Sequence, residues 1–277
     1  MSPLVSVVVP TKGRVTSVQR AIDSITSQTL DDLEVLMIDD SSPDDHAILQ
    51  KIGKKDDRIR VIRGFGRGPE HARWLGSTMA RGTYLASLDS DDEWLPEKLR
   101  THLTARSMHE ERIGLSWDPF VVVDQNKLYI SRAPPSIPRD GSVVPPEVLL
   151  RWVLLKPFLH MSAAVMEMQC FQQVGGFSMK RPSDYFLFVR LIEKKNALYV
   201  NEPLTVVHTE GSGRLSTNKE IMNDWKKIVP SQVPVIIRNL HTLGGLSFLG
   251  RWVKFRIGEI AQSRFFHNVS HYEPYTE

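Results

Sequence analysis

The first ninety residues alternate between short runs of apolar, often β-branched residues and longer stretches in which apolar residues recur at helical spacing. The runs typical of strands are 5–9, 33–38, 59–63 and 84–88. The stretches typical of helices are 16–27, 44–52 and 70–80. Parallel strands need a crossover connection, usually a helix, so this alternation predicts βαβ units. We therefore expect an α/β fold with a mixed, mostly parallel sheet flanked by helices.

Carboxylates follow two of these expected strands. Asp39-Asp40 comes directly after strand 33–38, and Asp89-Ser90-Asp91-Asp92 comes after strand 84–88. In open α/β sheets, ligands bind in the crevice beyond the carboxyl ends of the strands. We therefore expect both acidic clusters to line a binding crevice.

The second acidic cluster predicts a divalent cation. Three carboxylates in one short turn repel one another unless a cation or hydrogen-bond donors compensate them. Asp89 and Asp91 can point into the same space, and oxygen ligands suit Mg²⁺ or Mn²⁺. Mg²⁺ completes its shell with water and phosphate oxygens, so a nucleotide diphosphate is the expected companion. The alternative is a solvated acidic turn, with Asp92 near the N-terminus of a helix that starts around Pro96.

Asp39 and Asp40 have two interpretations. Their carboxylates could accept hydrogen bonds from a base and from ribose hydroxyls, or they could cap the helix that starts near Pro43. Lys12 and Arg14 lie in an expected loop on the same edge of the sheet, where they could contact phosphates.

The composition removes several classes of function. Thirty-five Lys and Arg against 32 Asp and Glu leave a net charge of +3, without the dense cationic face that nucleic-acid binders need. Cys170 is the only cysteine, so no internal disulfide and no cysteine-based zinc site can form. We find no secretion signal and no apolar run of about 18 residues that could span a bilayer. We therefore expect a cytoplasmic protein that does not bind nucleic acid.

The second part of the chain continues the α/β pattern to about residue 216. Its expected strands are 113–117, 121–124, 162–166, 197–200 and 204–208. Its expected helices are 96–109, 146–155, 169–174 and 184–194, and 134–146 is a proline-rich loop. We expect one domain over residues 1–216, with a nucleotide-binding half over about 1–95 and an acceptor-side half over about 96–216.

Residues 217–277 form a basic extension with a helical pattern. The apolar residues of its predicted stripe are Leu246, Leu249, Val253, Ile257 and Ile260, widened by Phe248, Trp252 and Phe255. One interpretation is a C-terminal helix that packs on the domain. The other is a basic amphipathic surface for a membrane or a protein partner, which would place the protein at the inner face of a membrane.

Four ordered blocks of the sequence resemble those of family 2 glycosyltransferases with the GT-A fold. The blocks are Val5-Ser6-Val7-Val8-Val9-Pro10-Thr11, Ile38-Asp39-Asp40-Ser41-Ser42-Pro43-Asp44, Gly68-Pro69 with Ala72-Arg73, and Leu88-Asp89-Ser90-Asp91-Asp92-Glu93-Trp94. Further on, Gly175-Gly176-Phe177 followed by Ser183-Asp184-Tyr185 and Arg190 is similar to the acceptor-side block of that family. The resemblance covers about residues 3–216.

The resemblance implies an inverting transfer of a sugar from a nucleotide-diphosphate sugar to an acceptor hydroxyl, with Mn²⁺ or Mg²⁺ as cofactor. A UDP-sugar is the favoured donor, and the acceptor is a glycan, a glycolipid or a small molecule. The positions it places at the nucleotide are Pro10, Thr11, Asp39, Asp40, Arg73 and Asp89, with Lys12, Arg14 and Ser90 beside them. The resemblance makes Asp91 the principal metal ligand, with Asp92 and His208 as further ligands. It makes Asp184 the general base.

Asp184 suits the role of base on chemical grounds. Displacement at an anomeric carbon needs a group that takes the proton of the acceptor hydroxyl. An aspartate does this at pH 7 only if burial raises its pKa or if proton transfer is coupled to bond formation. The alternative is that Asp184 caps helix 184–194. The sequence also departs from the residues that the family usually has at three places, which are Lys12-Gly13, Trp74 and Ser183.

Two other functions stay open at this point. A sugar-nucleotide pyrophosphorylase has related architecture, but its N-terminal glycine-rich loop and Pro-Lys signature are missing. A non-catalytic nucleotide-sugar-binding or scaffold protein would keep the fold, although the intact Asp89, Asp91 and Asp184 argue against it. We expect the residues that select donor and acceptor in the loops around Asp118, 134–146 and 179–183.

Overall fold

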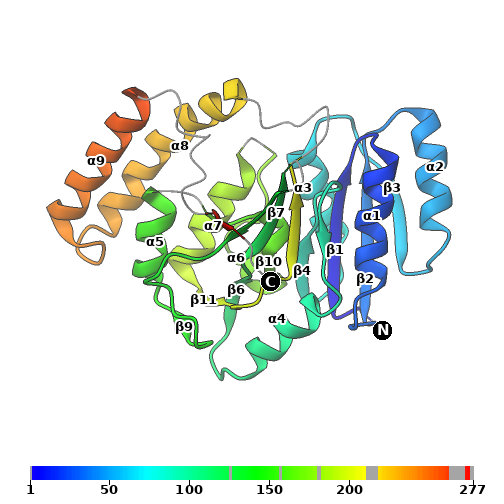
Figure 1. Ribbon diagram of the computed structural model, residues 1–277, viewed down its shortest axis with the longest axis horizontal. Coiled ribbons are helices and arrows are strands. Elements are labelled where there is room, and N and C mark those ends of the chain that lie inside the picture. Colours follow the sequence, from blue (N-terminus) through cyan, green and yellow to red (C-terminus); the bar gives the residue numbers. More distant parts are fainter. Residues whose placement is uncertain are drawn as a thin grey trace.

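The computed structural model describes residues 2–124, 127–155, 158–179, 182–209, 218–261 and 272–274. An eight-stranded sheet runs through the molecule, and helices pack on both of its faces (Figure 1). A second sheet of five short strands accompanies it. The chain therefore has the α/β fold that its alternating pattern predicts.

The elements have the following bounds. The strands of the larger sheet are β1 (Val5–Thr11), β2 (Leu33–Asp39), β3 (Ile59–Arg63), β4 (Tyr84–Ser87), β6 (Ile113–Trp117), β9 (Val143–Val144), β10 (Ala164–Glu167) and β11 (Asn196–Tyr199). The strands of the smaller sheet are β5 (Glu93–Trp94), β7 (Phe120–Asp124), β8 (Lys127–Ser131), β12 (Thr205–His208) and β13 (Tyr272–Pro274). The helices are α1 (Val15–Thr26), α2 (Pro43–Gly53), α3 (Pro69–Met79), α4 (Lys98–Ser107), α5 (Pro146–Leu155), α6 (Met168–Gln173), α7 (Ser183–Lys194), α8 (Asn218–Arg238) and α9 (Gly245–Ala261), with a 3₁₀ turn η1 (Met161–Ala163).

The βαβ units form the parallel part of the larger sheet, whose strand order is β3-β2-β1-β4-β10-β6-β11-β9. β1 pairs in parallel with β2 and β4, and β2 pairs in parallel with β3. β10 runs antiparallel between β4 and β6. Parallel strands covered by helices on both faces are apolar throughout, and all seven residues of β1 are buried.

Alternate residues of β1 face two separate apolar layers. Val8 packs in a cluster with side chains of α3, α5 and α7, whereas Val7 and Val9 pack in a cluster with α1, α2 and α4. The ends of β1 and β2 are in register, with Thr11 opposite Asp39. The carboxyl ends of β1, β2 and β4 therefore meet at one edge of the sheet, which places both acidic clusters there.

Three short strands lie where the sequence predicts none. β5 and β9 have two residues each, too few to produce a periodic pattern, and β9 lies inside the predicted loop 134–146. β8 forms a hairpin with β7, and its partly exposed residues do not alternate clearly between apolar and polar. The first residues of the predicted strand 162–166 belong to η1 instead.

The tail helices α8 and α9 lie side by side at one end of the molecule and pack on the domain (Figure 1). Phe248 and Trp252 are 1% and 8% exposed in the apolar cluster that contains α5 and α7. Leu246 is 77% exposed and Val253 is 41% exposed, so the predicted packing stripe is wrong for these two residues. The side chains of Phe255, Ile257 and Ile260 lie outside the described part of the structure, as does the loop 210–217.

The tail also contains a strand, which the helical pattern does not predict. β13 pairs antiparallel with β8. No helix in the described part of the chain combines the length and the hydropathy that crossing a bilayer requires. The expected boundaries near residues 95 and 216 stay predictions.

Candidate functional site

The turn after β4 holds three carboxylates, and two of them pair with arginines. Arg73 Nη2 donates to Asp89 Oδ1 at 2.5 Å, and Arg14 Nη1 donates to Asp91 Oδ2 at 2.7 Å. Burial favours the uncharged form of Asp89 and so acts to raise its pKa. The neighbouring Arg73 favours the charged form, and the net effect is a lowered pKa of this carboxyl. Cations of the chain itself therefore compensate part of the repulsion expected in this turn.

Arg14 reaches the turn from the start of α1 with unusual backbone geometry. Its φ of 52° and ψ of 46° lie in the left-handed region, which non-glycine residues rarely adopt. Arg20 of α1 adds a second contact, because its Nη2 donates to the backbone oxygen of Asp91 at 2.7 Å. The start of α1 is thus fixed against the acidic turn.

Asp92 is the buried member of the cluster, with 2% exposure. Ser162 Oγ donates to Asp92 Oδ2 at 2.6 Å, and His160 Nδ1 lies 3.8 Å from the same oxygen. Burial, together with repulsion from Asp89 and Asp91, raises the pKa of Asp92 to about 7. The alternative of a solvated acidic turn is therefore wrong for Asp92, which faces protein groups.

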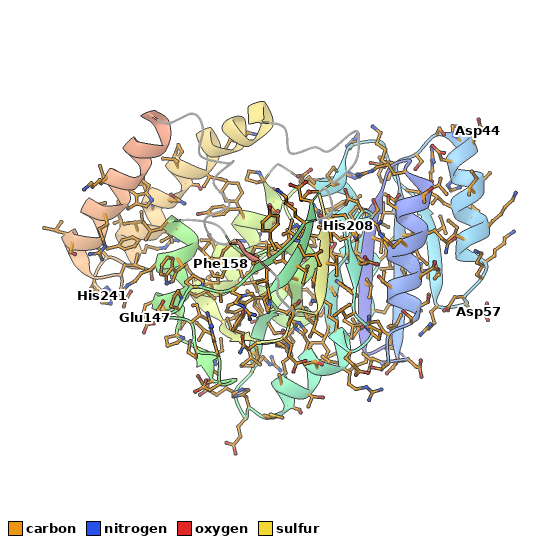
Figure 2. The ribbon with its side chains drawn as sticks, in the orientation of Figure 1. Asp44, Asp57, Glu147, Phe158, His208 and His241 are labelled. Carbon is orange, nitrogen blue, oxygen red and sulfur yellow. The ribbon has the colours of Figure 1, made fainter. Side chains whose placement is uncertain are left out.

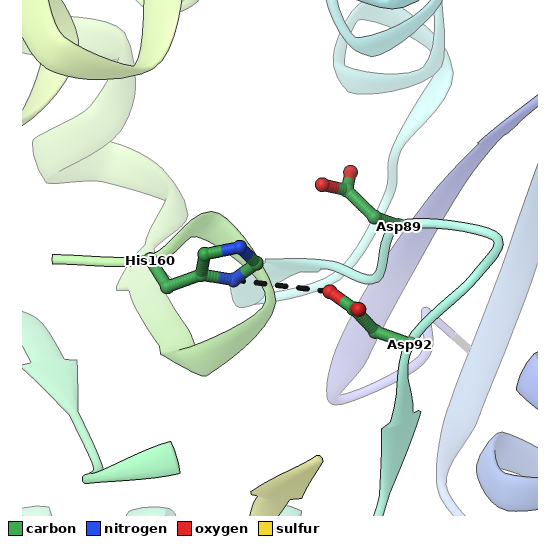
Figure 3. Close-up of side chains that lie close together, drawn as sticks. All are labelled: Asp89, Asp92 and His160. Carbon is green, nitrogen blue, oxygen red and sulfur yellow. Dashed lines mark ion pairs between the residues drawn. The ribbon is translucent and has the colours of Figure 1, made fainter. Parts of the chain in front are cut away.

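Asp89, Asp92 and His160 lie close enough to share one cation (Figure 3). Each offers a ligand atom, and these atoms all lie within 4.8 Å of one another. The carboxylates suit Mg²⁺ or Mn²⁺, and the imidazole suits a transition metal, so Mn²⁺ is the cation that fits all three donors. The residues present at the turn therefore fit the cofactor that the sequence implies.

Two of the predicted metal ligands lie outside this three-residue group. Asp91 is engaged with Arg14, and His208 at the end of β12 (Figure 2) has its Nε2 2.7 Å from Glu93 Oε1. The sequence analysis missed His160, because no motif surrounds it. Only the pairing of β10 with β4 brings His160 to the acidic turn.

Asp184 lies in the first turn of α7, and its charge acts on Arg73. Burial opposes the charge of Arg73, but Asp89 and Asp184 outweigh burial and raise the pKa of Arg73. Arg73 is 7% exposed, and its buried Nε has no hydrogen-bond partner among the described residues. The residue at the N-cap position of α7 is Pro182, and Asp184 Oδ1 accepts from the backbone N–H of Tyr185 at 2.8 Å. Pro182 therefore occupies the N-cap position, while Asp184 bonds one backbone N–H of the first helical turn.

Asp39 is a buried support at the end of β2. Its Oδ1 accepts from the backbone N–H of Ser41 at 2.7 Å, and its Oδ2 accepts from Arg63 Nη1 at 3.1 Å. Burial opposes its charge, but these donors outweigh burial and lower the pKa of Asp39. The side chain that caps α2 is Ser42, so the capping interpretation of Asp39 and Asp40 is wrong.

Asp40 holds the glycine-rich loop of residues 64–68, which connects β3 to α3. Its Oδ1 accepts from the backbone N–H of Gly66 at 2.8 Å, and its Oδ2 accepts from that of Gly68 at 3.1 Å. Gly64 permits this approach, because a Cβ atom there would lie 2.1 Å from Asp40 Oδ1. The backbone N–H of Asp40 also donates to Thr11 O at 2.9 Å. The loop, Asp40 and the end of β1 therefore form one connected wall.

The other residues predicted at the nucleotide lie along the end of β1 and in the acidic turn. Pro10 and Thr11 end β1 and are buried, Lys12 is exposed, and Ser90 is 3% exposed. Thr11 Oγ1 is buried, and no residue in the described part of the chain forms a hydrogen bond with it. Buried hydroxyls are nearly always bonded, so a ligand atom at this position would satisfy the group.

Residues 6–143 match the family model described as Glycosyl transferase family 2. The chain belongs to this family. Over 126 residues it is 38% identical to an uncharacterized glycosyltransferase of Rickettsia felis, covering 46% of this chain and 21% of that protein. Over 102 residues it is 38% identical to the GalNAc(5)-diNAcBac-PP-undecaprenol beta-1,3-glucosyltransferase of Campylobacter jejuni, covering 36% of this chain and 33% of that protein. These alignments thus span only a minor part of each relative.

Solved structures give the fold of this family 2 chain. S. aureus TarS in complex with UDP-GlcNAc matches it with a TM-score of 0.67 at 16% identity, covering 94% of this chain and 75% of that one. The mannosyltransferase PcManGT from Pyrobaculum calidifontis, in complex with GDP-Man and Mn²⁺, matches with a TM-score of 0.60 at 18% identity, covering 94% and 76%. The chain therefore has the GT-A fold.

The family 2 chain contains a second group of charged side chains, in the interior next to the acidic turn. This buried cluster consists of Lys98, His102, Arg106 and Asp118. Asp118 Oδ1 accepts from Lys98 Nζ and lies 3.1 Å from His102 Nε2. Burial lowers the pKa of Lys98, and burial together with the charge of Lys98 lowers the pKa of His102 to about 4. Asp118 itself is 1% exposed, and the expectation that residues of the loop around it select donor and acceptor stays a prediction.

Ser162 connects the acidic turn to the region of the buried cluster. Its hydroxyl accepts from the backbone N–H of Asp89 at 3.2 Å while it donates to Asp92. Its backbone oxygen accepts from Trp94 Nε1 at 2.7 Å and from Thr205 Oγ1 at 3.4 Å. The sequence analysis missed Ser162, because a serine at the start of a strand has no distinctive pattern.

Proposed function

We propose that this family 2 chain transfers a sugar from a nucleotide-diphosphate sugar, with a UDP-sugar as the favoured donor, to a hydroxyl of an acceptor. One observation carries the proposal: Asp89 from the acidic turn and Asp184 from α7 both raise the pKa of the same buried guanidinium, that of Arg73. The acidic turn, which suits a cation and a diphosphate, and Asp184, which suits the role of general base, therefore both interact with Arg73.

Asp184 is the general base in this proposal. The acceptor oxygen attacks the anomeric carbon, and Asp184 takes the hydroxyl proton. The bond from the anomeric carbon to the diphosphate oxygen breaks, and its electron pair leaves with the diphosphate. Attack from the face opposite to the leaving group inverts the anomeric configuration. The partial exposure of Asp184 supports the role, because an acceptor can reach it.

Asp89, Asp92 and His160 would hold Mn²⁺ or Mg²⁺, which supplies charge neutralisation for the departing diphosphate when it is bound. Asp91 and His208 stay proposed as further ligands. Arg73 supports binding of the diphosphate, because its unpartnered Nε can donate to a phosphate oxygen. Arg14 is proposed for the same task, since its side chain is 35% exposed beside Asp91.

The wall formed by the end of β1, Asp40 and the glycine-rich loop is proposed to hold the nucleoside. The free hydroxyl of Thr11 supports this assignment. Pro10, Lys12 and Ser90 are proposed as neighbours of the nucleotide. Asp39 contributes by holding the end of β2 in place.

For the acceptor we propose a glycan linked to undecaprenol diphosphate. The name of the C. jejuni relative describes a beta-1,3-glucosyltransferase acting on such a molecule. An Escherichia coli relative, 32% identical over 121 residues, is named UDP-Glc:alpha-D-GlcNAc-diphosphoundecaprenol beta-1,3-glucosyltransferase WfaP. An acceptor of this class lies in a membrane, which fits a protein at its cytoplasmic face.

Thermal-shift measurements with UDP-, dTDP- and GDP-sugars, each with and without Mn²⁺, test the donor assignment. The largest increase in Tm is expected for a UDP-sugar, and only with Mn²⁺ present, since the ligand stabilises the folded state by mass action. An equal increase without metal, or no increase with any donor, would contradict the proposal. Proton NMR of the product then tests inversion, because it reports the anomeric configuration directly.

A further inference from the structure

The tail helices α8 and α9 carry large apolar side chains on the side that faces away from the core. On α8, Val233 is 41% exposed and Ile237 is 67% exposed. On α9, Leu246 is 77% exposed and Val253 is 41% exposed. These four residues are close together in the sequence, whereas the other exposed large apolar residues of the described chain are scattered over residues 48–179.

Each exposed pair lies on one helical face. Val233 and Ile237 are four residues apart, and Leu246 and Val253 are seven residues apart, so each pair returns to nearly the same angle around its helix. The opposite faces are buried, as shown by Val235 on α8 at 7% exposure and by Phe248 on α9 at 1% exposure. Each helix therefore has two apolar faces, one packed against the domain and one that no described residue covers.

The charged side chains that the structure describes on α8, on α9 and between them are all of one sign. Residues 227–254 contain four Lys and Arg and no Asp or Glu. Arg238 pairs with Glu193 of α7, but Arg251 and Lys254 on α9 are exposed, and Arg251 Nη1 donates to the neutral Ser247 Oγ at 2.7 Å. The whole chain has a net charge of only +3, so the excess of positive charge is concentrated in this segment.

We propose that the outer faces of α8 and α9 bind the surface of an anionic membrane. The docking surface consists of Val233, Ile237, Leu246 and Val253; Lys254 follows Val253 directly, and Arg251 lies farther around the exposed side of α9. Exposed aliphatic side chains enter the boundary between headgroups and acyl chains, while Lys and Arg contact anionic headgroups. The proposal stands apart from the proposed sugar transfer, because vesicle binding requires neither donor nor metal.

Charge complementarity favours a lipid surface that is negatively charged. A Lys or Arg near such a surface contributes about 1 kcal/mol, so two of them change the partition coefficient roughly thirtyfold. The described helices are too short or too polar to cross a bilayer, so the docking surface lies on the membrane rather than through it.

Flotation of the full chain with vesicles tests the docking surface. The chain should float with vesicles of equal parts phosphatidylglycerol and phosphatidylcholine, and much less with pure phosphatidylcholine. The double variant Ile237→Glu/Leu246→Glu should stay at the bottom of the gradient. The variant Arg251→Gln/Lys254→Gln should lower the partition coefficient on anionic vesicles by roughly tenfold to thirtyfold.

Met108 provides a matched control, because it is 76% exposed at the end of α4, away from the tail helices. Met108→Glu should float like the wild-type chain, and an unchanged Tm of every variant shows that the fold is intact. Absence of flotation by the wild-type chain would overturn the proposal and leave a protein partner as the remaining occupant of this surface. Equal flotation with neutral vesicles, or undiminished flotation of Ile237→Glu/Leu246→Glu, would also overturn it.

Discussion

The acidic turn and the buried cluster are neighbouring groups of charged side chains. They differ in how many hydrogen-bond and ion-pair partners the protein provides to each carboxylate. In the buried cluster, Asp118 Oδ1 meets Lys98 and His102, and Asp118 Oδ2 accepts from the backbone N–H of Leu204 at 3.1 Å and from Thr205 Oγ1 at 2.9 Å. In the acidic turn, Asp89 and Asp91 each pair with one arginine, and their side chains are 28% and 21% exposed.

This difference separates a binding region from a supporting one. A partly exposed ion with one protein partner can exchange that partner for a ligand at little cost. A buried ion whose lone pairs are all used cannot rearrange without leaving a charge unpaired. The acidic turn therefore suits the diphosphate and the cation, and the buried cluster suits the task of holding Ser162 and β12 in place.

The largest effect is expected from the binding region. Asp184→Asn removes the proposed base while it keeps the size of the side chain, so turnover should fall by about 10³-fold. Affinity for the nucleotide-sugar donor, measured by calorimetry, should stay within a few-fold of the wild-type value. Glu193→Gln at the other end of α7 is the matched control and should leave turnover unchanged. Undiminished turnover of Asp184→Asn would remove the base from the proposal.

Lys98→Met tests the supporting region. The substitution leaves the carboxylate of Asp118 buried without its main cation, so the free energy of unfolding in urea should fall by about 3–5 kcal/mol. Arg14→Met is the counterpart in the acidic turn and should cost less than about 1 kcal/mol, because that pair is partly exposed. Similar losses for the two variants would break the distinction between the regions.

The pH dependence of stability should report His102. Burial lowers its pKa to about 4 from an ordinary value of 6.5, so between these values the unfolded chain binds a proton that the folded chain does not. His102 therefore makes its full contribution to the free energy of unfolding above pH 6.5. This contribution, about 3 kcal/mol in all, is lost as the pH falls toward 4. Urea unfolding across this window should show a shallower slope for His102→Gln. A slope equal to that of the wild-type chain would contradict this assignment.

Ser162→Ala should have a smaller effect on stability than Lys98→Met, and it should affect both regions. It leaves the Asp89 N–H and the Asp92 carboxyl without their hydroxyl partner, so stability should fall by about 1–3 kcal/mol. Mn²⁺ affinity, measured by calorimetry, should weaken several-fold because the ligand carboxylate loses its orientation. Ser162→Thr keeps a hydroxyl and should recover most of the Mn²⁺ affinity. Unchanged Mn²⁺ affinity in Ser162→Ala would show that the turn holds its shape without this contact.

The sequence predicts the strands and helices of the βαβ part within about two residues at each end. Apolar periodicity is a local property, and each of these elements buries a face that its own residues specify. The acidic turn, Arg73 and Asp184 are also found from the sequence, because their motifs are short and ordered. The family match over residues 6–143 confirms the resemblance around the acidic turn and Arg73, whereas Asp184 lies outside the matched residues and its role stays a prediction.

The features that the sequence analysis missed depend on contacts between distant segments. His160 and Ser162 reach the acidic turn only through the pairing of β10 with β4. Asp118 follows a strand, as a binding carboxylate would, but Lys98 and His102 of α4 enclose it. On α9 both faces are apolar, so periodicity alone does not tell which face packs on the domain.

The position of β10 in the sheet has a consequence for synthesis of the chain. β4 has β1 on one side and receives its other neighbour only from residues 164–167, where Val165 lies opposite Ala86. Until the ribosome has released that segment, β4 is an edge strand with unpaired backbone groups. Closing such a distant pair costs chain entropy before its contacts form, so the β1–β3 units should fold first. The acidic turn then meets Ser162 and His160 in a later step, and a nascent chain that ends before β10 cannot assemble the metal-binding group.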